Sequence, residues 1–311
     1  MHKRFSNSIL SAKQFNKNNL LEILDVSEKI ERTLKKQKEI PLLKEYILAT
    51  LFFEPSTRTR LSFEAAMHRL GGKVITSVGM QFSSLAKGET LFDTLKMVEA
   101  YADICAIRHP VEGASVLAAE NISIPVINAG DGAGEHPTQA LLDLYTINKH
   151  KSLIEKKLKI AFIGDIRYGR TIHSLIHLLK HFECELTFIS PSEISLPEKY
   201  KNELNSHSIS FLENENLNKA KGADVLYVTR IQEERFTDRK IYEKFKDAYI
   251  IDKDFVFKSC PKAIVMHPLP RLNEVSTNLD DTPNAVYFDQ AKNGLYTRMA
   301  LILKLLNINI E

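Results

Sequence analysis

Five consecutive residues, Ser56-Thr57-Arg58-Thr59-Arg60, place three hydroxyl groups and two guanidinium groups side by side. They follow an apolar run, Tyr46 to Phe53, which predicts a buried strand, and Pro55 holds Glu54 out of the helical conformation. The next helix should therefore begin near Ser56. The first turn of a helix offers unpaired N–H groups and the positive end of the helix dipole. This turn predicts an anion site, and a small phosphorylated substrate is the expected ligand.

A helical pattern follows this turn, and Gly71-Gly72 predicts its end. We expect one face of the helix to pack on a core through Leu61, Phe63, Ala66 and Leu70. Arg60 is expected to pair with Glu64, four residues on, and is not counted as catalytic. The alternative interpretation of the turn is a Ser/Thr cap followed by solvated arginines.

Phe52 to Glu64 reads Phe-x-Glu-Pro-Ser-Thr-Arg-Thr-Arg-x-Ser-Phe-Glu, and this segment resembles the carbamoyl phosphate signature of the aspartate/ornithine carbamoyltransferase family. Further segments resemble the aspartate-specific members in the expected order: Lys87-Gly88-Glu89-Thr90, Arg108-His109-Pro110, His136-Pro137-Thr138-Gln139, Gly164-Asp165 with Tyr168-Gly169-Arg170, Thr229-Arg230-Ile231-Gln232 and His267-Pro268-Leu269-Pro270-Arg271. The resemblance spans nearly the whole chain.

Composition narrows the class of protein. A length of 311 residues with 44% hydrophobic residues suits about two domains. The formal charge of +3 is too slight to predict nucleic acid as a partner. Without a secretory apolar core or an apolar run of about 18 residues, neither export nor a membrane partner is predicted, and we expect a cytoplasmic location. Cys105, Cys184 and Cys260 lie far apart, so we expect packed, reduced thiols and no metal site.

Short apolar runs alternate with longer amphipathic ones, which is typical of parallel α/β sheets. The sequence therefore predicts an α/β fold of two domains, each a parallel sheet flanked by helices. We place the carbamoyl-phosphate-binding domain at residues 1–145, completed by a C-terminal helix at 290–311, and the aspartate-binding domain at 146–289. The polar stretch Glu213-Asn214-Glu215-Asn216 is interpreted as a surface turn.

Six polar or loop residues each come soon after a predicted strand: Arg58, Arg108, His136, Arg170, Arg230 and Leu269. Ligands of open parallel sheets bind at the carboxyl ends of the strands. Since three of the six fall in each domain, we expect the active site in the cleft between the domains.

The resemblance implies a role for each matching residue. The phosphate would be held by Ser56, Thr57, Arg58, Thr59 and Arg108. The carbonyl oxygen would be polarised by Thr59, Arg108 and His136. The carbamoyl and amine N–H groups would meet Gln139 and the backbone carbonyls of Pro268 and Leu269. For His136 alone, a loop histidine that caps a helix is the alternative.

The second domain indicates the amine substrate. The guanidinium groups of Arg170 and Arg230, together with the amide of Gln232, suit a dicarboxylate. The ornithine enzymes of the family carry cysteine where this chain has Pro268. The resemblance therefore implies carbamoyl transfer to L-aspartate, which gives N-carbamoyl-L-aspartate in de novo pyrimidine biosynthesis, without a cofactor.

The resemblance also implies a homotrimer, because the loop with Ser83 and Lys87 reaches the neighbouring subunit's site in this family. An exposed connection is the alternative for that loop. Regulatory chains or a dihydroorotase are possible further partners.

Three other functions remain as alternatives: a carbamoyltransferase for another amine such as ornithine, a non-catalytic assembly domain, and a nicotinamide-dependent oxidoreductase. Gly164 to Arg170 follows a strand, as a dinucleotide fingerprint would, but Ile166 stands where the middle glycine is needed. Gly130 to Gly134 lacks the Lys-Ser/Thr of a P-loop. An inert domain is disfavoured by the joint presence of six residues: Arg58, Lys87, Arg108, His136, Arg170 and Arg230.

Overall fold

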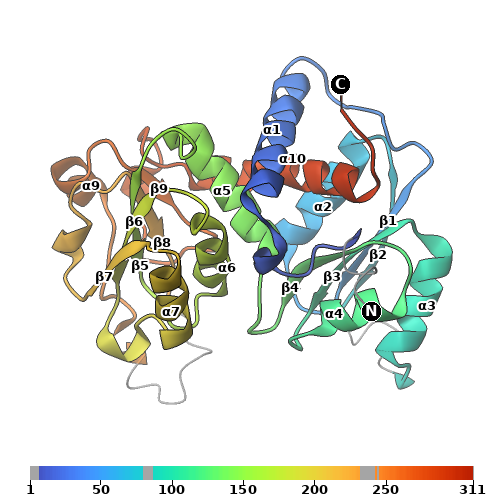
Figure 1. Cartoon of the computed structure of the whole chain (residues 1–311), viewed down its shortest axis with the longest axis horizontal. Helices are drawn as coiled ribbons and strands as arrows, with labels where there is room; N and C mark the ends of the chain where they lie inside the picture. Colours follow the sequence, from blue (N-terminus) through green and yellow to red (C-terminus); the bar gives the residue numbers. More distant parts are fainter. Residues whose placement is uncertain (1–6, 80–86, 232–241, 244, 311) are drawn as a thin grey trace. The chain divides into compact units, whose positions relative to one another are not determined.

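The computed structural model describes residues 7–79, 87–231, 242–243 and 245–310 (Figure 1). The chain forms two compact units. Unit 1 consists of Met1–Leu142 and Lys292–Glu311, and unit 2 consists of Asp143–Ala291. Each unit is an α/β structure with one parallel sheet in its described residues. Within those same ranges, no helix is both long and apolar enough to cross a membrane, and no cluster of potential metal ligands occurs.

The sheet of unit 1 has the strand order β2-β1-β3-β4 in the part of the chain that is described. Its strands are β1 (Ile47–Phe52), β2 (Lys73–Val78), β3 (Ile104–His109) and β4 (Val126–Asp131). Its helices are α1 (Lys17–Leu34), α2 (Thr57–Arg69), α3 (Leu91–Tyr101) and α4 (Ala114–Asn121). The chain passes outward from β1 to β2 and then returns to β3. The strand order therefore reverses between β1 and β3, which is where ligands bind in open α/β sheets.

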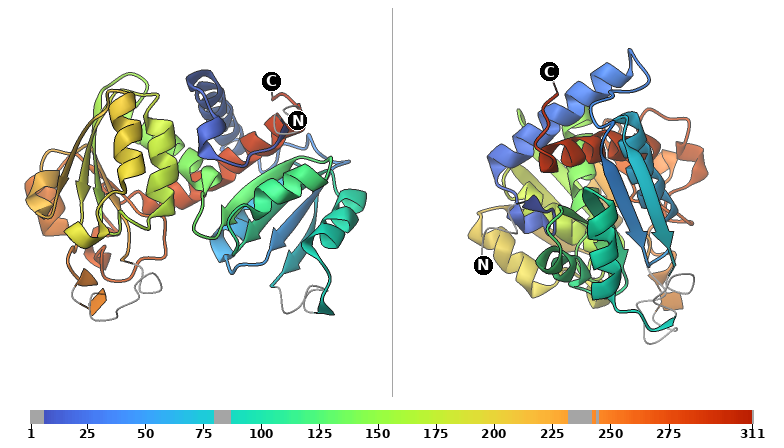
Figure 2. Two further views of the ribbon diagram at one scale, coloured as in Figure 1. Left: turned by 60° about the horizontal axis from the view of Figure 1, so that its bottom comes forward. Right: turned by 90° about the vertical axis from the view of Figure 1, so that its right-hand side faces the viewer.

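Helices cover both faces of this sheet (Figure 2). On one face, Ala49 and Leu51 of β1 form a core with residues of α3 and α4 such as Leu95 and Ala118. On the other face lies α2, whose Phe63 is fully buried. The first-strand and α2 predictions are confirmed, because α2 begins directly after its N-cap residue, Ser56.

One detail of the α2 prediction is wrong. Leu61 is 51% exposed, whereas Phe63, Ala66 and Leu70 are fully buried. An α-helix advances about 100° per residue, so Leu61 lies nearly opposite Phe63 and Leu70 and cannot share their core.

The sheet of unit 2 has the order β7-β6-β5-β8-β9 among the described residues. Its strands are β5 (Leu158–Ile163), β6 (Cys184–Ile189), β7 (Ser210–Asn214), β8 (Val225–Val228) and β9 (Ile264–Met266). Its helices include α6 (Arg170–Leu179), α7 (Glu198–Ser206) and α9 (Lys253–Ser259). The strand order reverses between β5 and β8, so the expected ligand position of this sheet lies between these two strands.

β7 corrects the interpretation of Glu213 and Asn214 as part of a turn. Both residues pair with β6, through Phe188 and Ile189. β7 is an edge strand with no buried residue, and only Phe211 and Leu212 of its five residues are apolar.

Two helices, α5 (Pro137–Lys151) and α10 (Tyr287–Leu305), have residues in both units. Within unit 1, the C-terminal part of α10 lies beside α1, and Lys304 forms an ion pair with Glu22 there (Figure 2). The expectation of packed thiols is confirmed, since Cys105, Cys184 and Cys260 are all buried and reduced.

Candidate functional site

The turn between β1 and α2 has the form of an anion site. Ser56 is the N-cap of α2, with extended backbone (φ −161°), yet its hydroxyl forms no capping bond to the described first turn. Thr57, Arg58 and Thr59 form that turn, in which Thr59 is buried and Arg58 is exposed. The prediction that Arg60 pairs with Glu64 is confirmed, with 3.8 Å between Arg60 Nε and Glu64 Oε1.

Arg108 supplies a second cation to this turn from the end of β3. Its Nε lies 3.3 Å from Glu54 Oε2, and its Nη1 donates to the carbonyl oxygen of Ala129 at 3.5 Å. Burial lowers the pKa of Arg108, although the Glu54 carboxylate opposes this change. The pKa of Arg58 is lowered by burial and then by the positive charge of Arg108. Two positive charges thus lie close enough to repel each other beside the carboxyl ends of β1 and β3. An anion bound there would relieve the repulsion.

Gly130 borders both Arg108 and His136. The φ of Gly130 is +118°, and a Cβ on this residue would lie 3.2 Å from Arg108 Nη1 and 3.6 Å from His136 Cδ2. His136 is buried directly before α5, where its carbonyl oxygen accepts the N–H of Gln139 at 3.0 Å. The structure therefore brings Arg58, Arg108 and His136 to one edge of the unit 1 sheet, with Gln139 in the first turn of α5.

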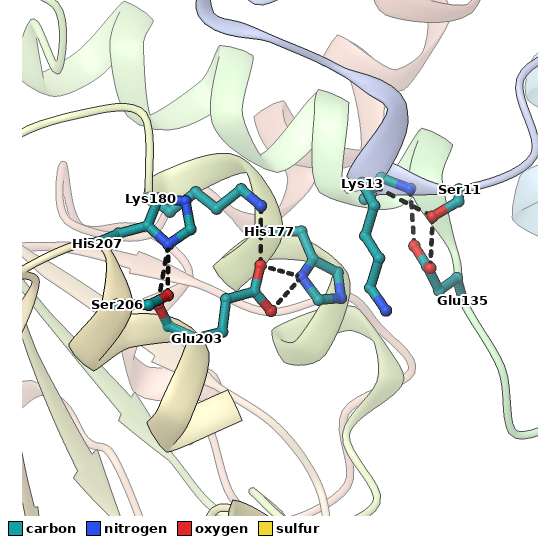
Figure 3. A network of polar contacts seen from close by, with 9 residues as sticks. Ser11, Lys13, Glu135, His177, Lys180, Glu203, Ser206 and His207 are labelled. Carbon is teal, nitrogen blue, oxygen red and sulfur yellow. Dashed lines mark hydrogen bonds and ion pairs between the residues drawn. The ribbon is translucent and has the colours of Figure 1, made fainter. Parts of the chain in front are cut away.

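The loop before His136 is held at both of its ends. Asp131 Oδ1 accepts the N–H of Glu135 at 2.9 Å, and Asp131 Oδ2 accepts the N–H of Gly113 at 3.1 Å. The Glu135 carboxylate accepts the Ser11 hydroxyl at 2.6 Å and the Ala12 N–H at 2.7 Å (Figure 3). The N-terminal segment thus fixes the loop that carries the histidine.

In unit 2, the two arginine residues that are predicted to bind aspartate lie where the strand order reverses between β5 and β8. Arg170 is the first residue of α6, and Arg230 comes two residues after the end of β8. The segment that follows β5 touches the segment that follows β8, because a Cβ on Gly164 (φ +115°) would lie only 2.1 Å from the Thr229 carbonyl oxygen. The Asp165 N–H donates to Thr229 Oγ1 at 3.1 Å, which fixes the approach. Both arginine residues are half-buried and lie on the connections that follow two neighbouring strands.

The loop after β9 carries the predicted carbonyl groups of Pro268 and Leu269. Leu269 has a left-handed backbone (φ +54°), which costs a non-glycine residue on the order of 1–3 kcal/mol, and the bond to Pro270 is cis. Arg271 stabilises the end of the loop by donating two hydrogen bonds to the Asp280 carboxylate, at 2.5 and 2.6 Å. Pro268 and Leu269 are half-buried.

Three predicted residues belong to loops that are only partly described. Ser83 and Gln232 lie outside the described residues, so the structure does not test them. Lys87 is described and exposed, at the end of the first of these loops.

Two family models match most of the chain. Residues 7–149 match the model "Aspartate/ornithine carbamoyltransferase, carbamoyl-P binding domain", and residues 156–305 match "Aspartate/ornithine carbamoyltransferase, Asp/Orn binding domain". The chain belongs to the aspartate/ornithine carbamoyltransferase family.

Individual members of the family cover almost the whole chain. The aspartate carbamoyltransferase catalytic subunit of Leptospira biflexa is 55% identical and covers 98% of each chain. The crystal structure of the catalytic subunit of Methanocaldococcus jannaschii aspartate transcarbamoylase is 50% identical, with a TM-score of 0.91, over 97% of this chain and 98% of the other. A Trypanosoma cruzi aspartate transcarbamoylase, solved with carbamoyl phosphate and aspartate, is 37% identical with a TM-score of 0.89 over 95% of each chain.

Sequence reasoning missed two contributors to this carbamoyltransferase site. Glu54 lies within the signature, but the sequence gives no signal for its ion pair with Arg108. In the sequence, Gly130 belongs only to a glycine-rich stretch that fails as a P-loop, whereas in the structure it lies against both Arg108 and His136. The available signal was a glycine six residues before the histidine, at the end of a predicted strand.

Proposed function

We propose that this chain transfers the carbamoyl group of carbamoyl phosphate to the amine of L-aspartate, giving N-carbamoyl-L-aspartate and phosphate for pyrimidine biosynthesis. The observation that carries the proposal is the pair of cations, Arg58 and Arg108, whose pKa values are both lowered at the N-terminus of α2. Such a pair matches a phosphate dianion, and the half-buried Arg170 and Arg230 offer two forks to a dicarboxylate.

The phosphate end of the substrate would lie on the α2 turn. Ser56, Thr57, Thr59 and the two arginines would bind its oxygens, as helix N-termini and guanidinium groups commonly do. Thr59, Arg108 and His136 would then donate to the carbonyl oxygen as it gains negative charge. Arg108 would serve both groups, because its charge acts on Arg58 of the α2 turn and its guanidinium group borders Gly130, which also borders His136.

The reaction itself needs no covalent enzyme intermediate. The unprotonated amine of aspartate attacks the carbonyl carbon, the bond from that carbon to the phosphate oxygen breaks, and phosphate leaves and accepts the proton that the nitrogen loses. Arg170, Arg230 and Gln232 would hold the two carboxylates of aspartate. Gln139 and the carbonyl groups of Pro268 and Leu269 would orient the N–H groups of both substrates.

A homotrimer with shared sites forms part of the proposal. β2 is an edge strand without a single buried residue, and Ile75 and Val78 are exposed on it. Strands of parallel sheets are normally covered on both faces, so this edge suits a second copy of the chain. The loop that follows β2 contains Ser83 and Lys87, which would complete the neighbour's site. Association with regulatory chains or with a dihydroorotase stays a prediction, as does a cytoplasmic location.

The test is product formation from carbamoyl phosphate with aspartate and with ornithine in parallel. We expect carbamoyl-aspartate and phosphate in equal amounts, with little product from ornithine. Equal efficiency with the two amines would contradict the assignment of Arg170 and Arg230. Absence of product together with intact substrate binding would favour a non-catalytic domain.

A further inference from the structure

His267 is a fully buried histidine that the proposed mechanism does not use. It follows β9 directly, only 2% of its surface is exposed, and it precedes the two residues whose carbonyl groups are proposed to meet the substrates. Both ring nitrogens and the backbone N–H of His267 form hydrogen bonds.

The imidazole connects two parts of the loop. Its Nδ1 accepts the N–H of Leu269 at 2.8 Å, so Nδ1 carries no hydrogen, and Nε2 must then carry the hydrogen that it donates to Glu274 Oε1 at 2.7 Å. Glu274 is ionised: burial is the largest single influence and opposes its charge, but the hydrogen bond from His267 and the bonds from backbone N–H groups together lower its pKa. The same carboxylate accepts the N–H of Leu272 at 3.1 Å. One tautomer of His267 thus fixes both ends of a short loop.

The backbone of His267 is fixed by the core of unit 2. Its N–H donates to Gln290 Oε1 at 2.9 Å, and Gln290 Nε2 donates to Asp143 Oδ1 at 2.6 Å. Asp143 Oδ2 in turn accepts the hydroxyl of Tyr227 at 2.7 Å. All four side chains are buried, so this network has little freedom to move.

We propose that His267 is a positioning residue for carbamoyl transfer, which sets the Pro268 and Leu269 carbonyl groups through the Leu269 N–H. Leu269 is the left-handed residue of the loop, and a rotation there would move both carbonyl groups. The inference rests on the proposed function and extends it, because a misplacement of about 1 Å in a reacting complex costs roughly 100-fold in rate.

A matched pair of substitutions tests the proposal in the full-length protein. In His267→Asn, the amide oxygen replaces Nδ1 and can still accept the Leu269 N–H, whereas in His267→Gln the amide nitrogen replaces Nε2 and can still donate to Glu274. We expect His267→Gln to weaken carbamoyl phosphate binding and to lower kcat by about tenfold or more. His267→Asn should retain clearly more carbamoyl phosphate affinity and a clearly higher kcat than His267→Gln. Inorganic phosphate, which has no carbamoyl group, should bind all three proteins within about twofold in calorimetry.

The possible results separate the two proposals. If both variants lose activity equally and in proportion to their melting temperatures, His267 has only a structural role and this inference fails, while wild-type turnover still supports the carbamoyltransferase. Failure of the wild-type protein to turn over carbamoyl phosphate and aspartate would overturn both. If His267→Gln does not fold, Gln290→Met removes the acceptor of the His267 N–H, and it should show the same loss toward carbamoyl phosphate and not toward phosphate. Equal weakening of both ligands would refute the inference.

Discussion

Replacing Arg58 with alanine should abolish most of the turnover without weakening the fold. Arg58 is exposed on the first turn of α2, and partial burial together with the positive charge of Arg108 lowers its pKa. Its removal relieves the repulsion between the two charges, and alanine favours the helix at least as well, so the melting temperature should not fall. The phosphate would keep Arg108 and the helix N-terminus but would lose one preorganised donor. Such a loss costs about 2.7–4 kcal/mol, which is roughly 100- to 1,000-fold in kcat.

Arg60→Ala is the matched control, since Arg60 lies two residues further along the same helix. Its guanidinium group faces Glu64 at 3.8 Å, and such partly exposed pairs contribute about 0.3–0.5 kcal/mol to stability. We expect Arg60→Ala to keep near-normal turnover. Steady-state kinetics with both substrates, accompanied by circular dichroism and thermal melts, distinguish the two variants. The proposed binding of phosphate by Arg58 would be refuted if Arg58→Ala kept more than a third of wild-type turnover. It would also be refuted if Arg60→Ala lost as much turnover as Arg58→Ala.

Three further predictions concern unit 2 and assembly. Arg230→Ala should raise the KM for aspartate far more than the KM for carbamoyl phosphate, since truncating one partner of a desolvated charge pair costs about 2–5 kcal/mol; equal effects on both would contradict the assignment. Inactive Arg58→Ala and Lys87→Ala proteins, dissociated and reassembled together, should regain part of the activity if sites are shared, and no gain over either parent would argue against sharing. Burial lowers the pKa of His173 from 6.5 to about 4, so the neutral form favours folding, and the free energy of unfolding should fall by roughly 3 kcal/mol as pH drops from about 6.5 to 4. The free energy of unfolding, measured by urea denaturation at several pH values in that range, should depend less on pH in His173→Phe than in the wild-type protein. An unchanged pH dependence would exclude His173 as its source.

The parts of the molecule that the sequence predicts well are local ones. Ser56 to Arg60 are consecutive, and the strand, proline and helix around them determine their geometry without help from distant residues. Both sheets could also be inferred in outline, because buried parallel strands are continuous apolar runs. β7 gives a weak signal because only two of its five residues are apolar, and Leu61 is apolar although the helical period places it on the exposed face of α2.

The supporting contacts could not be predicted, because they depend on the tertiary fold. Glu54 meets Arg108, which lies 54 positions further along the chain, and only the pairing of β1 with β3 brings them together. The same holds for His267, whose partner Gln290 lies 23 residues away on another element. Periodicity gives no signal for such pairs. Burial decides their importance, since an unmatched polar group inside the protein is costly.

The discontinuity of unit 1 has a consequence for the order in which a ribosome would let the two units fold. Ser8 and Leu10 bond to residues 118 positions later, and Glu22 pairs with Lys304, 282 positions later. At roughly 5–20 residues per second, the first of these partners emerges about 6–24 s after the segment it must bind. Unit 2, by contrast, is one uninterrupted stretch, Asp143–Ala291. The unit that begins first is therefore finished last: all four described strands of its sheet precede residue 132, but they lack the packing of the C-terminal helix until that helix is released.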